Sequence, residues 1–292
     1  MTQMEATWIK NSTTGRSLPR PPRVVRGAFA ALSRSAPWLA ARLAEVLFLR
    51  PPRRRAPERE RVWVGGATRL ELRVAGRRLA VWTRGVGPTV LLIHGWGGRG
   101  SQLGAFIEPL VRHGFRVAWF DHVGHGASQG GLSSLPEMAE AIGEVGRRIG
   151  PLHAIVAHSL GSAAATIAQH AGLSVERCVY LSPPTTILYF TRVFCDILGF
   201  TREIEARLQR RIERRFDIRF NDLHGPRLAR EMTPPPLLIF HDRTDTDVPF
   251  SHGVELATAW PRAKLVLTNG LGHRAILRET AVVDQAVEFV SA

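Results

Sequence analysis

The most informative segment of the sequence runs from His153 to His170 and reads HAIVAHSLGSAAATIAQH. Its first five residues are typical of a buried strand, and Ser162–His170 is typical of a helix. Ser159 stands between the two, with Ala157 and Gly161 two residues away on either side. Small residues at those positions let a strand and a helix approach closely, so that the turn between them lifts the serine hydroxyl above the sheet. This pattern predicts a nucleophilic serine, although glycine is more usual than Ala157 at the first small position.

Short apolar runs on both sides of this segment alternate with helical stretches. This alternation predicts a parallel sheet buried on both faces, with the chemistry collected at the carboxyl ends of its strands. A hairpin precedes it, formed by Leu70–Val74 and Leu79–Thr83 around Ala75-Gly76-Arg77. We therefore expect an α/β fold with a mostly parallel, eight-stranded sheet and helices on both faces. The predicted parallel strands are Thr89–Ile93, Arg116–Phe120, His153–Ala157, Cys178–Leu181, Leu237–Phe240 and Lys264–Leu267.

A proline-rich run separates this domain from a basic N-terminal segment. Residues 1–22 are polar and lack hydrophobic periodicity, so we expect them to be mobile. Residues 24–49 show the three-and-four spacing of one amphipathic helix. Arg50–Pro57 ends it, because proline removes a backbone donor and restricts the residue before it. We predict an N-terminal segment at 1–60 and an α/β domain at 61–292. The predicted apolar face of the helix comprises Trp38, Leu39, Leu43, Val46 and Leu47.

The strand–helix alternation is interrupted between residues 184 and 233. The first part of this insertion is strongly apolar, and it is followed by a helix with a strict four-residue apolar repeat. Such a helical insertion above the strand ends predicts a lid. The apolar stretch indicates either an apolar substrate or packing of the lid on the body. We predict that Leu188, Phe190 and Phe194 contact the substrate, and the repeat of the second helix comprises Phe200, Ile204, Leu208, Ile212 and Phe216.

A glycine-rich turn, His94-Gly-Trp-Gly-Gly98, follows the first predicted parallel strand. Glycines let backbone N–H groups point at a developing anion without interference from side chains. We predict that the amides of Trp96 and Leu160 form an oxyanion hole. His94, Gly95 and His158 are predicted to contact the substrate at the same strand ends.

Five features in one order along the chain resemble the α/β-hydrolase fold superfamily. They are His94–Gly98, Asp121–Ser128 with the sequence DHVGHGAS, the Ser159 turn, and the later stations Asp245-Thr-Asp-Val-Pro249 and Gly270-Leu-Gly-His273. The resemblance covers about residues 62–290. It implies a serine, an acid and a histidine in that order along the chain.

The resemblance favours Asp245 as the acid, because the family's acid usually lies four residues before the proline of such a D-x-x-V-P run. Asp247 is the second choice and Asp242 the third. Among the eleven histidines, His273 follows a predicted strand through a Gly-Leu-Gly turn and lies far enough beyond Asp245 for one helix and one strand. We therefore predict Ser159, Asp245 and His273 as the catalytic residues. His122 and His125 are interpreted as turn scaffolding, and no metal site is expected.

A serine nucleophile with these partners predicts cleavage of a carboxylic ester or thioester through an acyl-enzyme. The same residues also serve carbon–carbon bond hydrolases, lactonases, perhydrolases and acyltransferases, because a fold does not determine a reaction. A non-catalytic ligand-binding protein of this fold is the alternative outside catalysis. No sequence pattern for a nucleotide or another cofactor is present, so none is expected.

The charge is concentrated near the N-terminus. The net charge of the chain is +14, and residues 1–61 carry 13 basic against 4 acidic residues. With few aromatic residues in this segment, a nucleic-acid partner is not expected. The predicted helix either docks on the hydrolase body or, together with the rest of residues 24–55, contacts an anionic membrane surface. Docking is preferred, because the apolar face is short and rich in alanine. The oligomeric state stays open.

Cysteine content and hydropathy indicate the compartment. Cys178 and Cys195 are the two cysteines of the chain, so no disulfide framework is expected. No run of about 18 apolar residues predicts a membrane span. The polar start of the sequence lacks the apolar core of a secretory signal. The expected location is the cytoplasm.

Overall fold

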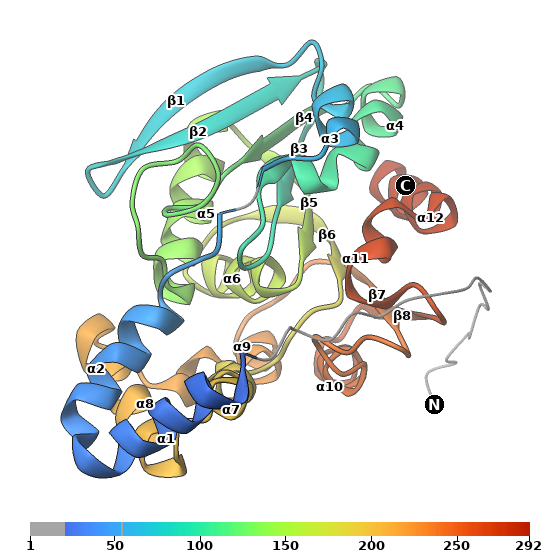
Figure 1. The fold of residues 1–292 in the computed structure, drawn as a ribbon. Helices are drawn as coiled ribbons and strands as arrows, with labels where there is room; N and C mark the ends of the chain where they lie inside the picture. Colours follow the sequence, from blue (N-terminus) through green and yellow to red (C-terminus); the bar gives the residue numbers. More distant parts are fainter. Residues whose placement is uncertain (1–20, 54) are drawn as a thin grey trace.

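The computed structural model describes residues 21–53 and 55–292, and Figure 1 shows how their elements are arranged. The sequence predicted that residues 1–22 are mobile. Residues 1–20 of that segment lie outside the described part of the chain.

Eight strands form one sheet in the order β1-β2-β4-β3-β5-β6-β7-β8. Strands β3 to β8 are parallel, whereas β1 pairs antiparallel with β2 and β2 pairs antiparallel with β4. The parallel strands are the short apolar runs seen in the sequence, and all five residues of β3 are buried. The expected α/β fold class is confirmed. The strands are β1 (Thr68–Val74), β2 (Arg77–Arg84), β3 (Thr89–Ile93), β4 (Arg116–Phe120), β5 (Leu152–His158), β6 (Val175–Leu181), β7 (Leu237–Asp242) and β8 (Ala263–Thr268).

Helices cover both faces of the sheet, because alternate residues of each buried strand point to opposite sides. In β3, Leu91 and Ile93 join one hydrophobic core, and Val90 and Leu92 join the other. The first core includes residues of α5 (Leu135–Ile149), α6 (Leu160–His170) and α10 (Ser251–Ala259). The second includes residues of the 3-10 helix Gly100–Phe106, α4 (Ile107–Arg112), the 3-10 helix Ile276–Arg278 and α12 (Thr280–Ser291).

The insertion between β6 and β7 is helical. It consists of α7 (Ile187–Leu198), α8 (Arg202–Phe216), the 3-10 helix Phe220–Leu223 and α9 (Gly225–Glu231). The predicted four-residue repeat is found in α8, where Ile204, Leu208 and Ile212 are buried. In Figure 1, α7 and α8 lie together with α1 and α2 as a helical group beside one end of the sheet domain.

The N-terminal segment contains two helices where the sequence predicted one. They are α1 (Arg23–Ser35) and α2 (Pro37–Phe48). The break is at Ala36, with φ −143° and ψ 69°, because the ring of Pro37 excludes the helical conformation from the residue before it. Helix α2 packs on α8 and α7, and α1 packs on α2 and α7. The N-terminal helices therefore dock on the insertion.

The predicted apolar face of this segment is not the face that docks. The buried residues of α2 are Ala40, Ala41, Ala44 and Glu45, whereas Trp38 and Val46 are exposed. Small side chains allow two helix backbones to approach closely, so the alanine face fits the groove of its neighbour better than bulky side chains would. The prediction is corrected: much of the larger apolar surface of α2 points outward.

A further helix was not predicted. Helix α3 (Glu58–Trp63) spans the expected boundary between residues 60 and 61. Glu60 is buried and accepts hydrogen bonds from Arg99 Nε at 2.6 Å and from Ser101 Oγ at 2.7 Å. This buried ion pair ties the N-terminal segment to the sheet domain.

The helices are short, and the longest in the described part of the chain, α5 and α8, have 15 residues each. None of the helices formed by residues 21–53 and 55–292 has the length and hydropathy that a membrane span requires.

Candidate active site

Ser159 occupies the sharp turn between β5 and α6. Its φ of 52° is in the left-handed region that side chains other than glycine disfavour. The turn is held in place because the Ser159 N–H donates to the carbonyl of Leu181, at the end of β6, at 2.9 Å. A side chain at Gly161 would collide with the carbonyl of His94, so glycine there lets α6 approach the end of β3. The strained turn presents Ser159 Oγ at the carboxyl edge of the sheet.

Two hydrogen bonds connect Ser159, His273 and Asp245. His273 Nε2 lies 2.9 Å from Ser159 Oγ, and His273 Nδ1 lies 2.7 Å from Asp245 Oδ2. Asp245 follows β7, and His273 lies in α11 (Gly272–Ala275), after β8. Because β5, β7 and β8 are parallel, their carboxyl ends meet at one edge of the sheet. A carboxylate only accepts hydrogen bonds, so Nδ1 donates to Asp245 and Nε2 is left to accept the serine proton.

Asp245 is held as a carboxylate in a buried position. Burial by itself raises the pKa of this group, but the hydrogen bond and charge of His273 outweigh it and bring the pKa to about 2. The backbone N–H groups of Asp247 and Val248 also donate to Asp245 Oδ1, each at 2.9 Å. The negative charge therefore persists throughout the neutral range and faces His273.

The two other candidate acids have different partners. Asp242 accepts hydrogen bonds from Thr244, from Thr268 Oγ1 at 2.7 Å and from the N–H of Leu271 at 3.0 Å. It thereby holds the loop that leads to His273. Asp247 forms an ion pair with Arg274 at 3.1 Å. Of the three aspartates, Asp245 is the one hydrogen-bonded to His273.

His158 supports His273 from behind. Burial lowers the pKa of His158 well below its ordinary value, so the ring is neutral. Its Nε2 donates to the carbonyl of His273 at 2.9 Å, and the two rings lie 4.6 Å apart. The sequence assigned His158 to substrate contact, and the structure adds this hydrogen bond to the backbone of His273.

Two buried histidines support the glycine-rich turn. His94 Nδ1 donates to the carbonyl of Gly95 at 2.7 Å, and His125 Nε2 accepts from the N–H of Gly97 at 3.1 Å. Burial lowers the pKa of His94 to about 4 and that of His125 to about 3, so both are neutral at physiological pH. A Cβ added at Gly95 would lie 2.8 Å from Ser159 Cβ, which brings the turn directly against the serine.

The Asp121–Ser128 loop is held by hydrogen bonds to Asp121. The buried carboxylate of Asp121 accepts hydrogen bonds from the N–H of Gly100 at 2.7 Å and of Ala127 at 2.8 Å. His122 is fully buried, and its ring nitrogens have no hydrogen-bond partner among the described residues. Within the described chain, no group of three or more His, Cys, Asp or Glu side chains could hold a metal ion.

A cavity of about 830 Å³ opens at Ser159 and His273. Of the predicted substrate contacts, Gly95, His158, Phe190 and Phe194 line it, as do Trp96 and Leu160. Two predictions are corrected. His94 is fully buried and supports the turn from below, and Leu188 packs against the hydrophobic core because it lies on the side of α7 that faces away from the cavity.

The cavity also has walls that the sequence did not predict. Helix α2 contributes Leu47 and Phe48, whereas Val193 and Ile197 of α7, which also line the cavity, belong to the apolar stretch predicted for the lid. Exposed arginines line its outer part. The apolar character of residues 47–49 was visible in the sequence, but no local pattern indicates that an N-terminal helix reaches the catalytic edge. The arginines are Arg50, Arg55, Arg59, Arg274 and Arg278.

Comparisons with known families agree with this architecture. A family model described as "alpha/beta hydrolase fold" matches residues 88–192, and one described as "TAP-like protein" matches residues 222–290. The chain therefore has the α/β-hydrolase fold.

Solved structures give the same fold at low sequence identity. A candidate lipase from Acinetobacter baumannii is 19% identical, with a TM-score of 0.64 over 80% of this chain and 93% of its own. A Pyrococcus furiosus esterase is 18% identical, with a TM-score of 0.62 over 82% of this chain and 98% of its own. The thioesterase domain from the curacin biosynthetic pathway is 16% identical, with a TM-score of 0.58 over 78% of this chain and 100% of its own. No curated protein sequence matches significantly.

Proposed function

We propose that this protein is a serine hydrolase that cleaves a carboxylic ester or thioester through an acyl-enzyme. The observation that carries the proposal is the hydrogen-bonded series Asp245–His273–Ser159 at the mouth of an apolar cavity. Relatives of this fold described as lipases, esterases and thioesterases support hydrolysis as the general reaction.

In the proposed reaction, Ser159 Oγ attacks the carbonyl carbon of the substrate while His273 Nε2 takes its proton. Asp245 stabilises the imidazolium that results and keeps His273 in the required tautomer. His273 then gives the proton to the leaving alcohol or thiol, and the acyl group stays on Ser159. Water attacks the acyl-enzyme with His273 as the base, which releases the acid and restores the serine.

The amides of Trp96 and Leu160 are proposed to stabilise the oxyanion. Leu160 is the first residue of α6, so its N–H has no partner within the helix. An added Cβ at Gly95 would lie 3.4 Å from the Leu160 nitrogen, so the two turns are in contact. Removing one oxyanion donor typically lowers kcat by about 100- to 1000-fold, which makes these two amides a substantial part of the mechanism.

The cavity favours a substrate with an apolar acyl group and an anionic leaving portion. Phe190, Phe194 and Ile197 of α7, with Phe48 of α2, form apolar walls. Arginines lie on the solvent side, where a carboxylate or phosphate of the leaving portion would be attracted. We also propose that the insertion α7–α9 acts as a lid whose apolar face covers the acyl group.

Labelling with a fluorophosphonate probe tests the nucleophile. Under the proposal, the probe labels the wild-type protein and leaves Ser159→Ala unlabelled. Ser162→Ala is the matched control, because the Ser162 hydroxyl is buried and donates to the carbonyl of Ala157 instead. Equal labelling of wild type and Ser159→Ala would exclude Ser159 as the nucleophile.

Turnover of p-nitrophenyl esters and acyl thioesters of graded chain length then tests the substrate class. We expect kcat/KM to rise with acyl length until the cavity is filled. A labelled Ser159 without turnover of any ester or thioester would contradict this substrate class and favour another reaction of the same three residues.

A further inference from the structure

The outward face of α2 carries large apolar side chains. Trp38 is 65% exposed, Leu39 is 40% exposed and Val46 is 38% exposed. Isolated exposed apolar residues are common on soluble proteins, but these three share one helix of 12 residues. The buried face of α2 is rich in alanine, and these three large side chains lie outside it.

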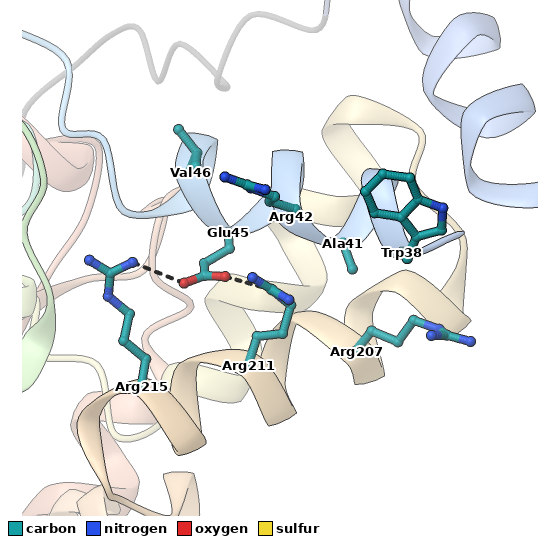
Figure 2. Close-up of a pocket in the computed structure, with 8 residues that line it drawn as sticks. All are labelled: Trp38, Ala41, Arg42, Glu45, Val46, Arg207, Arg211 and Arg215. Carbon is teal, nitrogen blue, oxygen red and sulfur yellow. Dashed lines mark hydrogen bonds and ion pairs between the residues drawn. The ribbon is translucent and has the colours of Figure 1, made fainter. Parts of the chain in front are cut away.

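A groove lies between α2 and α8, directly beside this face (Figure 2). Its volume is about 490 Å³. In Figure 2, Arg211 and Arg215 reach from α8 to Glu45 of α2, and Arg207 extends to the side. Trp38, Arg42 and Val46 project from α2. We call this surface the α2–α8 groove; its lining residues are Trp38, Ala41, Arg42, Glu45, Val46, Arg207, Arg211 and Arg215.

The charge of the α2–α8 groove is strongly positive. Its lining holds four arginines and one glutamate, a net charge of +3. Glu45 is buried and accepts from Arg211 at 2.6 Å and Arg215 at 3.1 Å, so it fixes these two guanidinium groups along the groove. Arg207 pairs with Glu203 at 2.8 Å. Arg42 is exposed and has no ion pair with any residue in 21–53 or 55–292.

We propose that the α2–α8 groove docks on the surface of an anionic phospholipid bilayer. A short amphipathic helix can lie in the membrane interface with its apolar side chains among the lipids and its cations at the headgroups. Indole rings favour this interface, and guanidinium groups bind phosphate oxygens with two parallel hydrogen bonds. Trp38, Leu39 and Val46 supply the first component, and the groove arginines supply the second.

A bilayer would interact with both the apolar side chains and the arginines of this surface, whereas a nucleic acid would interact with the arginines alone. Phosphates of DNA or RNA would also attract Arg42 and the α8 arginines. They would leave the aliphatic side chains of Leu39 and Val46 without an apolar environment. The inner face of α2 can dock on the insertion while its outer face contacts lipid, so docking and membrane contact are compatible.

The groove also adjoins the candidate active site. Val46 lines the groove, and the next two residues, Leu47 and Phe48, line the catalytic cavity. The link between the groove and catalysis rests on the proposed function. Under that function, an acyl ester held in the bilayer would lie close to the cavity entrance. Membrane binding itself does not depend on catalysis.

Sedimentation of the full-length protein with lipid vesicles tests the proposal. We expect binding to vesicles of equimolar phosphatidylcholine and phosphatidylglycerol at low salt, and much weaker binding to pure phosphatidylcholine. Raising NaCl from about 0.01 M to about 1 M shortens the Debye length from about 30 Å to about 3 Å and should release the protein. Arg42→Gln should weaken partitioning about fivefold. Trp38→Ala should weaken it at least as much, because the indole buries the largest apolar area.

Matched controls are available elsewhere on the surface. Val86→Ala removes an 82% exposed valine in the β2–β3 turn, and Arg73→Gln removes an exposed arginine of β1. Both should bind anionic vesicles as the wild type does. Ser159→Ala should also bind normally, which separates membrane docking from the proposed hydrolysis.

Several results would overturn the proposal. They are no binding to anionic vesicles, an equal loss of binding in the control variants, or a dimer by light scattering that Trp38→Ala dissociates. Tighter binding to duplex DNA than to anionic vesicles, unchanged in Trp38→Ala, would favour a nucleic-acid partner instead.

Discussion

The carboxyl edge of the sheet and the α2–α8 groove both combine apolar side chains with charge, but in different surroundings. At the sheet edge, Asp245 is buried and its charge is satisfied by His273 and two backbone N–H groups. In the groove, Glu45 satisfies two arginines while Arg42 and Trp38 face solvent. A buried charge must have its partners within the protein, because an unpaired one is very unfavourable. A surface that leaves cations and indole exposed together is suited to an external partner.

The largest expected effect is on catalysis at the sheet edge. Ser159→Ala should reduce kcat about a millionfold, because a triad loses nearly all of its advantage with its nucleophile. Its melting temperature should stay within a few degrees of wild type, since one hydroxyl is lost and the turn keeps its backbone bonds. Ester hydrolysis and thermal unfolding measure the two quantities. Activity within tenfold of wild type would exclude Ser159 as the nucleophile.

Asp245→Asn should lower kcat about 10,000-fold, because the amide favours the wrong tautomer of His273. Asp247→Asn is the matched control, since this residue pairs with the exposed Arg274 and does not contact His273. It should change kcat less than Asp245→Asn by at least two orders of magnitude. The reverse order, measured at saturating ester, would show that the acid is Asp247.

The buried histidines give the sheet edge a pH-dependent stability. The pKa of His125 is about 3 in the folded protein against an ordinary value of 6.5, so below pH 6.5 the unfolded chain binds a proton that the folded chain excludes. Stability is therefore lost as the pH falls from about 6.5 toward 3. His125→Asn should lower the slope of unfolding free energy between pH 6 and 4 by about 1.4 kcal/mol per pH unit.

Urea unfolding at several pH values measures this slope. Identical slopes in wild type and His125→Asn would mean that His125 is protonated in the folded protein.

The smallest effects distinguish the two faces of α2. Ala44→Leu should destabilise the protein by about 1–3 kcal/mol, because a larger side chain cannot fit the close contact between α2 and the insertion. Trp38→Ala should change stability by less than about 0.5 kcal/mol, because its side chain is mostly in solvent. Chemical unfolding of both variants gives the comparison. A larger loss from Trp38→Ala would mean that the indole packs within the protein.

Much of the fold was predictable because it depends on local pattern. The strands β3 to β8 are continuous apolar runs, and a strand buried on both faces needs nothing else to be recognised. The strand–serine–helix turn at Ser159 was visible for a similar reason, because only small residues fit where the two elements cross. The order of Ser159, Asp245 and His273 followed from the resemblance to the α/β-hydrolases.

The contacts between distant segments could not be predicted in the same way. Spacing alone did not separate Asp245 from Asp242 and Asp247, because all three follow β7 and the hydrogen bond to His273 depends on how two loops meet. His94 and Leu188 matched substrate contacts in position along the chain but face away from the cavity.

Helix α2 shows most clearly what the sequence determined and what only the tertiary structure decided. Its sequence determined that one side is alanine-rich and another is bulky and apolar, because helical periodicity sorts residues by angle. Which side would be buried was decided only when α8 supplied a surface that the backbone of α2 could approach through alanines. A periodic pattern defines the faces of a helix, whereas burial depends on the shape of the neighbour, which is a property of the tertiary structure.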